Sequence, residues 1–300
     1  MFDSPLSASA YEILGVAPDA SDDELRRAFR LQLRRTHPDT GGDAAVFIRV
    51  QRAWELVGTP RGREAYDRGH GFAGASEWSG WSAPQRADTR PRAQFHGEAG
   101  GALRRSYVEQ VRAWADAVVP HPYDPAFVRT VPVELRALLA HALAEEATSR
   151  ILAELGMGFT VWHDVAAATR ESDAVGKIDH VVLGPSGLFG VMSADTGADV
   201  RFRSGEILGA DAPVSDVIGR IRLLSRTARV RFSAALLVFP DDDLAEPVVP
   251  LRSERSMLVA VMRRSVLPTV LRTGIRGTRV IGGNELFDVR TRLQQTVRFA

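Results

Sequence analysis

Residues 21–43, SDDELRRAFRLQLRRTHPDTGGD, decide how the amino-terminal part of the chain folds. Ser21 and Glu24 have the spacing of a capping box, in which each side chain binds the other residue's backbone N–H, so a helix is expected to begin here. Pro38 disfavours helical geometry at the residue before it, so the helix must give way to a loop. We therefore predict a helix over residues 24–35. Its apolar stripe consists of residues at helical spacing, namely Leu25, Ala28, Phe29 and Leu33.

This helix is strongly basic, although the whole chain is nearly neutral. The 300 residues include 38 basic and 37 acidic side chains, which give a formal charge of +1. That balance, with 45% hydrophobic and 25% charged residues, argues against a disordered chain and against a chain-wide nucleic-acid polycation. Residues 24–35 contain one acidic residue, Glu24, and five arginines, which are Arg26, Arg27, Arg30, Arg34 and Arg35. The neutral total therefore conceals a local basic face.

The chain contains no cysteine, and Lys177 is its single lysine. The absence of cysteine excludes disulfides, thiolate nucleophiles, zinc ribbons and iron–sulfur sites. A reducing cytoplasm is a suitable setting for such a chain. The first residues lack the basic segment of a signal peptide, and no apolar run approaches the ~18 residues of a membrane span. We therefore expect a cytoplasmic protein without a membrane partner.

The basic helix is expected to form an antiparallel hairpin with a second long helix. A short helix around Tyr11 ends at Gly15, the second long helix is capped by Asp43 and ends at Gly58, and Pro60 can begin a fourth. Composition then divides the chain into three parts. They are a helical module over residues 9–68, a flexible linker rich in Gly, Ser, Pro and Arg over residues 70–105, and an α/β domain over residues 106–300.

The helical module resembles the J-domain of DnaJ-type co-chaperones. The resemblance covers residues 9–68 and is carried by Tyr11 to Val16, His37-Pro38-Asp39 after the basic helix, Ala53-Trp54-Glu55-Leu56, and Tyr66-Asp67. It implies a protein that binds a DnaK-type chaperone and stimulates its ATP hydrolysis. The implied chaperone-binding residues are His37, Pro38, Asp39, Arg26, Arg27, Arg30 and Arg34. Gln32 departs from the family, where an aliphatic core residue is common.

Nucleic-acid binding is a rival use of a basic helix. Acidic residues elsewhere in the module oppose it, and Asp39 at the tip of the hairpin would repel phosphate.

The carboxyl-terminal part is expected to form a small mixed sheet with helices on both sides. A long helical pattern runs from Leu135 to Leu155. Further apolar runs and turn residues predict strands over 160–165, 177–183, 188–192 and 234–239, helices over 214–228 and 256–271, and late strands near Val280 and Val289.

This region resembles the NERD (nuclease-related) domain, whose core is a restriction-endonuclease-like α/β fold. The residues that carry the resemblance are Glu145, the run 162–165 and the run 178–189. The family implies an aspartate on one strand and a Glu-x-Lys on the next, which together hold a divalent metal and stabilise charge. Asp179 fits the aspartate, but the Glu and Lys positions are occupied by Met192 and Ala194. The resemblance thus implies a relic nuclease site without enzyme activity, and no metal or cofactor.

A relocated site remains as an alternative. Lys177 and Asp179 are two residues apart on a strand, so both side chains can point to one face, where Glu145 can approach from the helix and Asp195 is near in sequence. A metal-dependent nuclease would then use Mg²⁺, and a DNA-binding protein would keep the fold without cleavage. His163 and His180 are interpreted as hydrogen-bonded structural residues.

The leading hypothesis is a co-chaperone whose catalytically inactive nuclease-like domain serves targeting or binding. Its partners would be a DnaK-type chaperone and a client protein, and the carboxyl-terminal domain could also bind nucleic acid.

Overall fold

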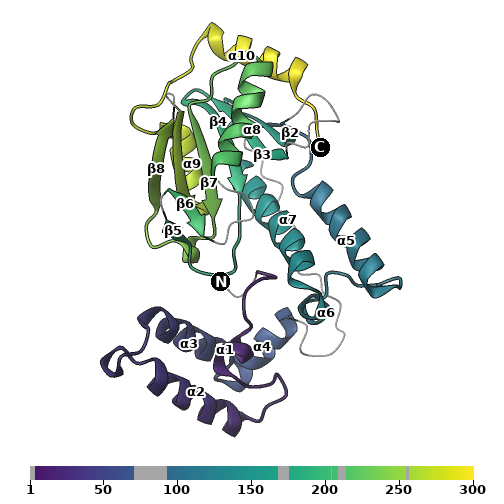
Figure 1. The fold of residues 1–300 in the computed structure, drawn as a ribbon, viewed down its shortest axis with the longest axis vertical. Helices are drawn as coiled ribbons and strands as arrows, with labels where there is room; N and C mark the ends of the chain where they lie inside the picture. The colour runs from purple at the N-terminus through teal and green to yellow at the C-terminus, as the bar shows by residue number, and fades with distance from the viewer. Residues whose placement is uncertain (1–3, 71–92, 168–175, 204, 209–213, 255–256) are drawn as a thin grey trace.

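The computed structural model describes residues 4–70, 93–167, 176–203, 205–208, 214–254 and 257–300. The chain forms a helical region and an α/β region (Figure 1). The helical region contains α1 (Ala10–Leu14), α2 (Asp22–Thr36), α3 (Ala44–Val57) and α4 (Pro60–His70). The capping box of Ser21 and Glu24 and the cap of α3 by Asp43 are both present, so local sequence signals predicted these helix starts correctly.

The four helices enclose one hydrophobic core. Its largest fully buried side chains are Tyr11, Leu14 and Leu25. Phe29 of α2 stacks on Trp54 of α3 with ring centroids 4.4 Å apart, which joins the two long helices. A polar contact closes the module, because the Tyr11 hydroxyl donates to Asp67 at 2.5 Å.

The predicted linker is too long. Only residues 71–92 of it lie outside the described part of the chain, whereas β1 (Gln94–His96) and α5 (Gly101–Ala115) belong to the α/β region. β1 pairs in parallel with β2 (Thr160–Ala166), and Ala93 is buried in the core. Gly97, Gly100 and Gly101 suggested a flexible segment, but they form the tight connection between β1 and α5. Gly100 adopts the left-handed conformation that this connection requires.

Besides β1 and β2, the strands of the α/β region are β3 (Lys177–Gly184), β4 (Gly187–Ser193), β5 (Arg201–Arg203), β6 (Glu206–Leu208), β7 (Ala234–Phe239), β8 (Val248–Glu254) and β9 (Met257–Arg263). Seven of the described strands form a mixed sheet of order β1-β2-β3-β4-β7-β9-β8. β2, β3 and β4 form an antiparallel meander, and β4, β7 and β9 are parallel. β8 adds an antiparallel edge strand, and β5 and β6 form a separate hairpin.

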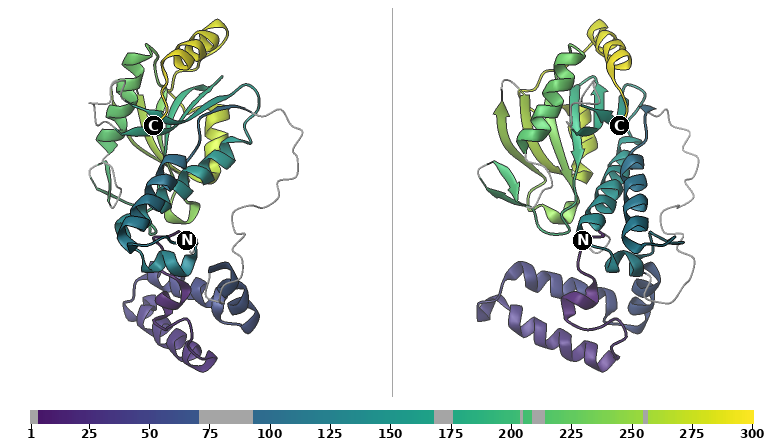
Figure 2. Two further views of the ribbon diagram at one scale, coloured as in Figure 1. Left: turned by 90° about the vertical axis from the view of Figure 1, so that its right-hand side faces the viewer. Right: turned by 45° about the vertical axis from the view of Figure 1, so that its right-hand side comes forward.

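Helices cover both faces of this sheet, as predicted. Residues of α8 (Val214–Thr227) and α10 (Asn284–Thr296) share one hydrophobic cluster with the sheet, and residues of α7 (Val133–Leu152) and α9 (Leu267–Thr273) share the other. α5 lies alongside α7, and α6 (Pro125–Thr130) is near the end of this helix pair that faces the helical region (Figures 1 and 2). Among the described helices, none combines the length and the apolarity that crossing a membrane requires.

Two predictions at the carboxyl-terminal end are wrong. Residues 256–271 do not form one helix, because Met257–Arg263 is the buried strand β9 and only the 3₁₀ turn Arg264–Val266 and α9 are helical. No described strand occurs near Val280 or Val289, and Val289 lies inside α10. Both errors have the same cause, because a short apolar run has no periodicity that distinguishes a buried strand from a helix.

Candidate functional site

The loop between α2 and α3 presents a tripeptide at the tip of the helical hairpin. His37 leaves the helix in an extended conformation (φ −63°, ψ 128°), and Pro38–Thr40 form a single 3₁₀ turn. The His37 Nδ1 atom accepts a hydrogen bond from the Asp39 backbone N–H at 3.2 Å, and the ring packs edge-on against Phe47 at 5.1 Å. The Asp39 side chain is 87% exposed. The fold thus orders the imidazole and leaves the carboxylate open to a partner.

The basic face of α2 leads directly to this loop. Arg26, Arg27, Arg30 and Arg34 are all exposed, while Leu25 on the opposite face is buried in the core. Gln32 is half-buried, and its amide nitrogen would lie 3.2 Å from a Cβ added to Gly15, so it packs against the end of α1. The departure at Gln32 is therefore accommodated inside the hairpin and does not alter the exposed arginines.

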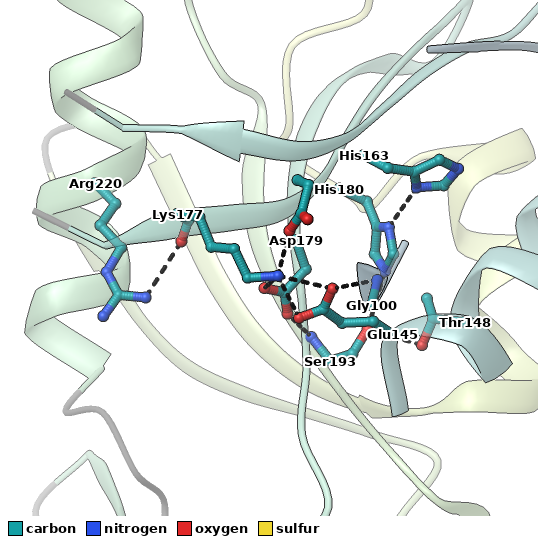
Figure 3. A network of polar contacts seen from close by, with 10 residues as sticks. Gly100, Glu145, Thr148, His163, Lys177, Asp179, His180, Ser193 and Arg220 are labelled. Atoms are coloured by element: carbon teal, nitrogen blue, oxygen red, sulfur yellow. Dashed lines mark hydrogen bonds and ion pairs between the residues drawn. The ribbon is translucent and has the colours of Figure 1, made fainter. Parts of the chain in front are cut away.

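A second polar cluster lies in the α/β region, around the single lysine (Figure 3). The Lys177 ammonium donates to both carboxylate oxygens of Glu145 at 2.6 and 2.8 Å, and also to Asp164. It lies 4.0 Å from Asp179. The side chains of these acids are at most 6% exposed and that of Lys177 is 16% exposed. Glu145, Lys177 and Asp179, the residues of the alternative relocated site, therefore lie together in one cluster, with Asp164 as an additional member.

Backbone groups complete the cluster. Glu145 also accepts a hydrogen bond from the Gly100 N–H at 2.9 Å. Gly100 is the N-cap of α5, and the amino-terminal end of a helix stabilises a negative charge. Asp179 accepts the Ser193 N–H at 2.7 Å. These contacts fasten α5, α7 and the sheet to one another through a single buried network.

The two strand histidines belong to a neighbouring chain of hydrogen bonds. His163 and His180 face each other with their Nδ1 atoms 2.7 Å apart, so one ring donates and the other accepts. His163 also contacts Ser149, and His180 also contacts the Ser193 hydroxyl. Both imidazoles are hydrogen-bonded within the core, as expected of structural histidines.

Burial controls the protonation of this region. It raises the pKa of Glu145 to about 8, with a further contribution from Asp179, while Lys177 opposes the shift. Burial also raises the pKa of Asp179. Burial alone would lower the pKa of Lys177, but Asp179 and Glu145 outweigh it and raise that pKa. Burial lowers the pKa of His163 to about 4, so its imidazole is neutral at pH 7.

The remaining relic positions lie elsewhere. Met192 and Ala194 are half-buried and pack against the hydrophobic cluster under α8. Their apolar side chains offer neither an oxygen ligand for a metal nor a charge. Asp195 is not part of the Lys177 cluster, and it lines a cavity with Asp243 and other residues at the carboxyl ends of the parallel strands. Asp164 and Ser193 are members of the cluster that the sequence pattern does not predict. Asp164 adopts a left-handed backbone conformation (φ 54°), which breaks the regular alternation of β2 and could not be read from spacing.

A divalent metal does not fit the Lys177 cluster as it stands. The ammonium already occupies both oxygens of Glu145 and contacts Asp164, and the Ser193 N–H occupies one oxygen of Asp179. Within the described ranges, no set of three or more His, Asp or Glu side chains is arranged to hold a metal ion. The cluster is a lysine-centred ion network.

The helical module is similar to known proteins. Residues 9–67 match the family model of the DnaJ domain. The chain is 45% identical over 58 residues to the DnaJ protein homolog of Cucumis sativus, which is 19% of this chain and 14% of that protein. It is 42% identical over 66 residues to chaperone protein DnaJ 1 of Cutibacterium acnes, covering 21% of this chain and 17% of the relative. It is 42% identical over 73 residues to chaperone protein DnaJ of Gloeothece citriformis, covering 23% and 19%.

The chain thus spans less than a fifth of the length of these curated relatives. The match coincides with the four helices, the exposed arginines and the tripeptide loop described above. The amino-terminal region of this chain is a J-domain of the DnaJ type.

Proposed function

We propose that this protein is a co-chaperone that binds a DnaK-type chaperone and stimulates its ATP hydrolysis. The observation that carries the proposal is the exposed His37-Pro38-Asp39 loop at the end of the exposed arginine face of α2. Arginines attract an acidic partner over a distance and form forked hydrogen bonds with carboxylates. The rigid loop limits the entropy lost on binding.

Stimulation requires that the bound J-domain favour one state of the chaperone. A partner shifts an equilibrium only by its difference in affinity for the two states. In this proposal the arginine face supplies most of the attraction. The tripeptide supplies the preference for the hydrolysis-competent state, which explains why a substitution there can abolish stimulation while binding persists.

The test is the steady-state ATPase rate of a DnaK-type chaperone with the full chain and its His37→Gln variant. We expect the variant to lose stimulation while its circular dichroism remains that of the wild type, because His37 is half-exposed at the tip of the hairpin. His121→Gln, an exposed histidine far from the loop in sequence, is the matched control and should stimulate normally. Full stimulation by His37→Gln would refute the proposal.

For the α/β region we propose a restriction-endonuclease-like fold of the NERD type that binds or targets without cleaving. Its support is the mixed sheet covered by helices on both faces and the apolar packing of Met192 and Ala194. The Lys177 ammonium at the centre of the buried acids gives further support, because it provides the counter-charge that an active site would take from a metal.

The alternative is a metal-dependent nuclease with a relocated site. It is favoured by the meeting of Glu145, Asp179 and Lys177 in one cluster, and it would require the ammonium to give up carboxylate oxygens. Cleavage of DNA and RNA substrates is to be assayed with Mg²⁺ or Mn²⁺. We expect no cleavage by the wild type, whereas activity that disappears in Asp179→Ala would establish the alternative.

A further inference from the structure

Two ion pairs join α3 of the J-domain to the α/β region. Arg49 pairs with Asp199 at 3.2 Å, and Arg52 pairs with Asp242 at 3.6 Å. Asp199 follows β4 and Asp242 follows β7, so both acids lie beyond the carboxyl ends of neighbouring parallel strands. Figures 1 and 2 show α3 between α2 and the α/β region. We call this surface, formed by Asp199 and Asp242, the acidic edge.

A second contact lies immediately before the J-domain. Residues 4–7, here named the strap, pass over the same edge of the sheet. Leu6 packs on Gly197 so closely that a Cβ added there would lie 2.7 Å from the leucine. The Ser7 hydroxyl donates to the Gly197 carbonyl at 3.5 Å, and Arg136 of α7 donates to the Pro5 carbonyl at 3.5 Å. The strap therefore touches both α7 and the loop after β4.

The strap restricts where the J-domain can be. Only Ala8 separates Ser7 from Ser9, which caps α1. Two residues span at most about 7 Å even when fully extended. While the strap is bound, α1 must remain beside the acidic edge. Exposed ion pairs of this kind are individually weak, but here they need only select the orientation of a module that is already tethered in place.

We propose that the acidic edge is a receptor for the J-domain of the same chain. The strap and the α3 arginines hold the J-domain in one orientation, and this closed form leaves the α2 face accessible to the DnaK-type chaperone. This inference deepens the proposed function, on which it rests for the identity of that chaperone. It assigns α3 to the α/β region and leaves α2 to the partner.

The two docking faces are compatible with each other. The acidic edge forms ion pairs with Arg49 and Arg52 of α3. The arginines assigned to chaperone binding are all exposed on α2, and the Asp39 side chain at the tip of the hairpin is 87% exposed. The closed form therefore presents the tripeptide without obstruction. Its consequence is that anything bound by the α/β region is held in a fixed position relative to the chaperone.

The test measures a distance distribution between the two regions. The chain lacks cysteine, so Arg61→Cys on α4 and Thr291→Cys on α10, both exposed positions, place two spin labels without interference. We expect one narrow distribution, unchanged when the labelled protein is diluted with an unlabelled excess. Gly197→Ala should broaden it, because the residue has φ +66° and the new methyl group collides with Leu6. Gly277→Ala is the matched control, since its φ is +86° and no atom lies within 4 Å of the added Cβ.

A charge exchange tests the orientation without altering a glycine. Arg49→Asp should broaden the distribution, and Arg49→Asp combined with Asp199→Arg should restore it. A broad distribution in the wild type, or no effect of Gly197→Ala and Arg49→Asp, would overturn the inference. So would a narrow distribution that is lost on dilution with unlabelled protein, because that result shows docking between two copies.

ATPase stimulation measured on the same samples separates this inference from the proposed function. His37→Gln should abolish stimulation and leave the distance unchanged. Gly197→Ala should broaden the distance distribution while stimulation continues.

Discussion

Lys177→Met should destabilise the α/β region by about 3–5 kcal/mol at pH 8, the usual cost of removing one partner of a buried ion network. Methionine keeps the aliphatic length of lysine but removes the ammonium that contacts Glu145 at 2.6 and 2.8 Å, contacts Asp164, and lies 4.0 Å from Asp179. Three nearly buried carboxyl groups then lack their counter-charge. Because the pKa of Glu145 is already raised to about 8, protonation limits the loss at lower pH. For each pH unit below this pKa, protonation of Glu145 reduces the destabilisation by roughly 1.4 kcal/mol.

The assay is urea unfolding followed by tryptophan fluorescence. Trp162 is 1% exposed in the core of the sheet, and a Trp162→Phe background identifies the part of the signal that reports on this region. Arg112→Met, an exposed position on α5, is the matched control and should change stability by less than about 0.5 kcal/mol. A decrease in the free energy of unfolding of less than about 1 kcal/mol for Lys177→Met would refute the reasoning. Such a result would mean that the carboxyl groups are already protonated or solvated by water.

Two further predictions concern stability. The raised pKa of Glu145 means that its stabilising contribution is complete below the ordinary value of 4.5 and is lost as pH rises through about 8. Between pH 6.5 and 8, unfolding free energies of the wild type should therefore fall relative to those of Glu145→Gln by up to about 1.4 kcal/mol per pH unit, and parallel curves would contradict this. His163 does not interfere, because its pKa is lowered to about 4 and its contribution changes below pH 6.5. Asp43→Ala should lower the melting temperature of the J-domain, because the side chain accepts two backbone N–H groups at the start of α3. Thermal unfolding can compare it with Asp19→Ala, an exposed control expected to be neutral.

The J-domain could be predicted closely because its signals are local. Capping residues, a proline after the helix and apolar spacing each act within a few residues, and they placed the start of α2, the cap of α3 and the loop at His37. The α/β region is different, because β9 is buried on both faces of a central sheet and shows no alternation. Its apolar run is therefore equally compatible with part of a helix, which is what we predict for it from the sequence.

The Lys177 cluster could be predicted only in part. The two-residue spacing of Lys177 and Asp179 on a strand, together with Glu145 on the preceding helix, was readable from the chain. Asp164 joins through a left-handed backbone conformation, and Ser193 joins through its N–H, which any residue would carry. Such contacts depend on tertiary geometry and leave no mark in residue types.

Single-turnover ATP hydrolysis by a DnaK-type chaperone tests the proposed co-chaperone activity of the J-domain most directly. The rate should rise with the concentration of the full chain. Asp39→Asn should remove that increase while its helix content stays unchanged, and Asp19→Asn, an exposed aspartate of the same module, should act like the wild type. Equal acceleration by wild type and Asp39→Asn, or no acceleration by either, would contradict the account.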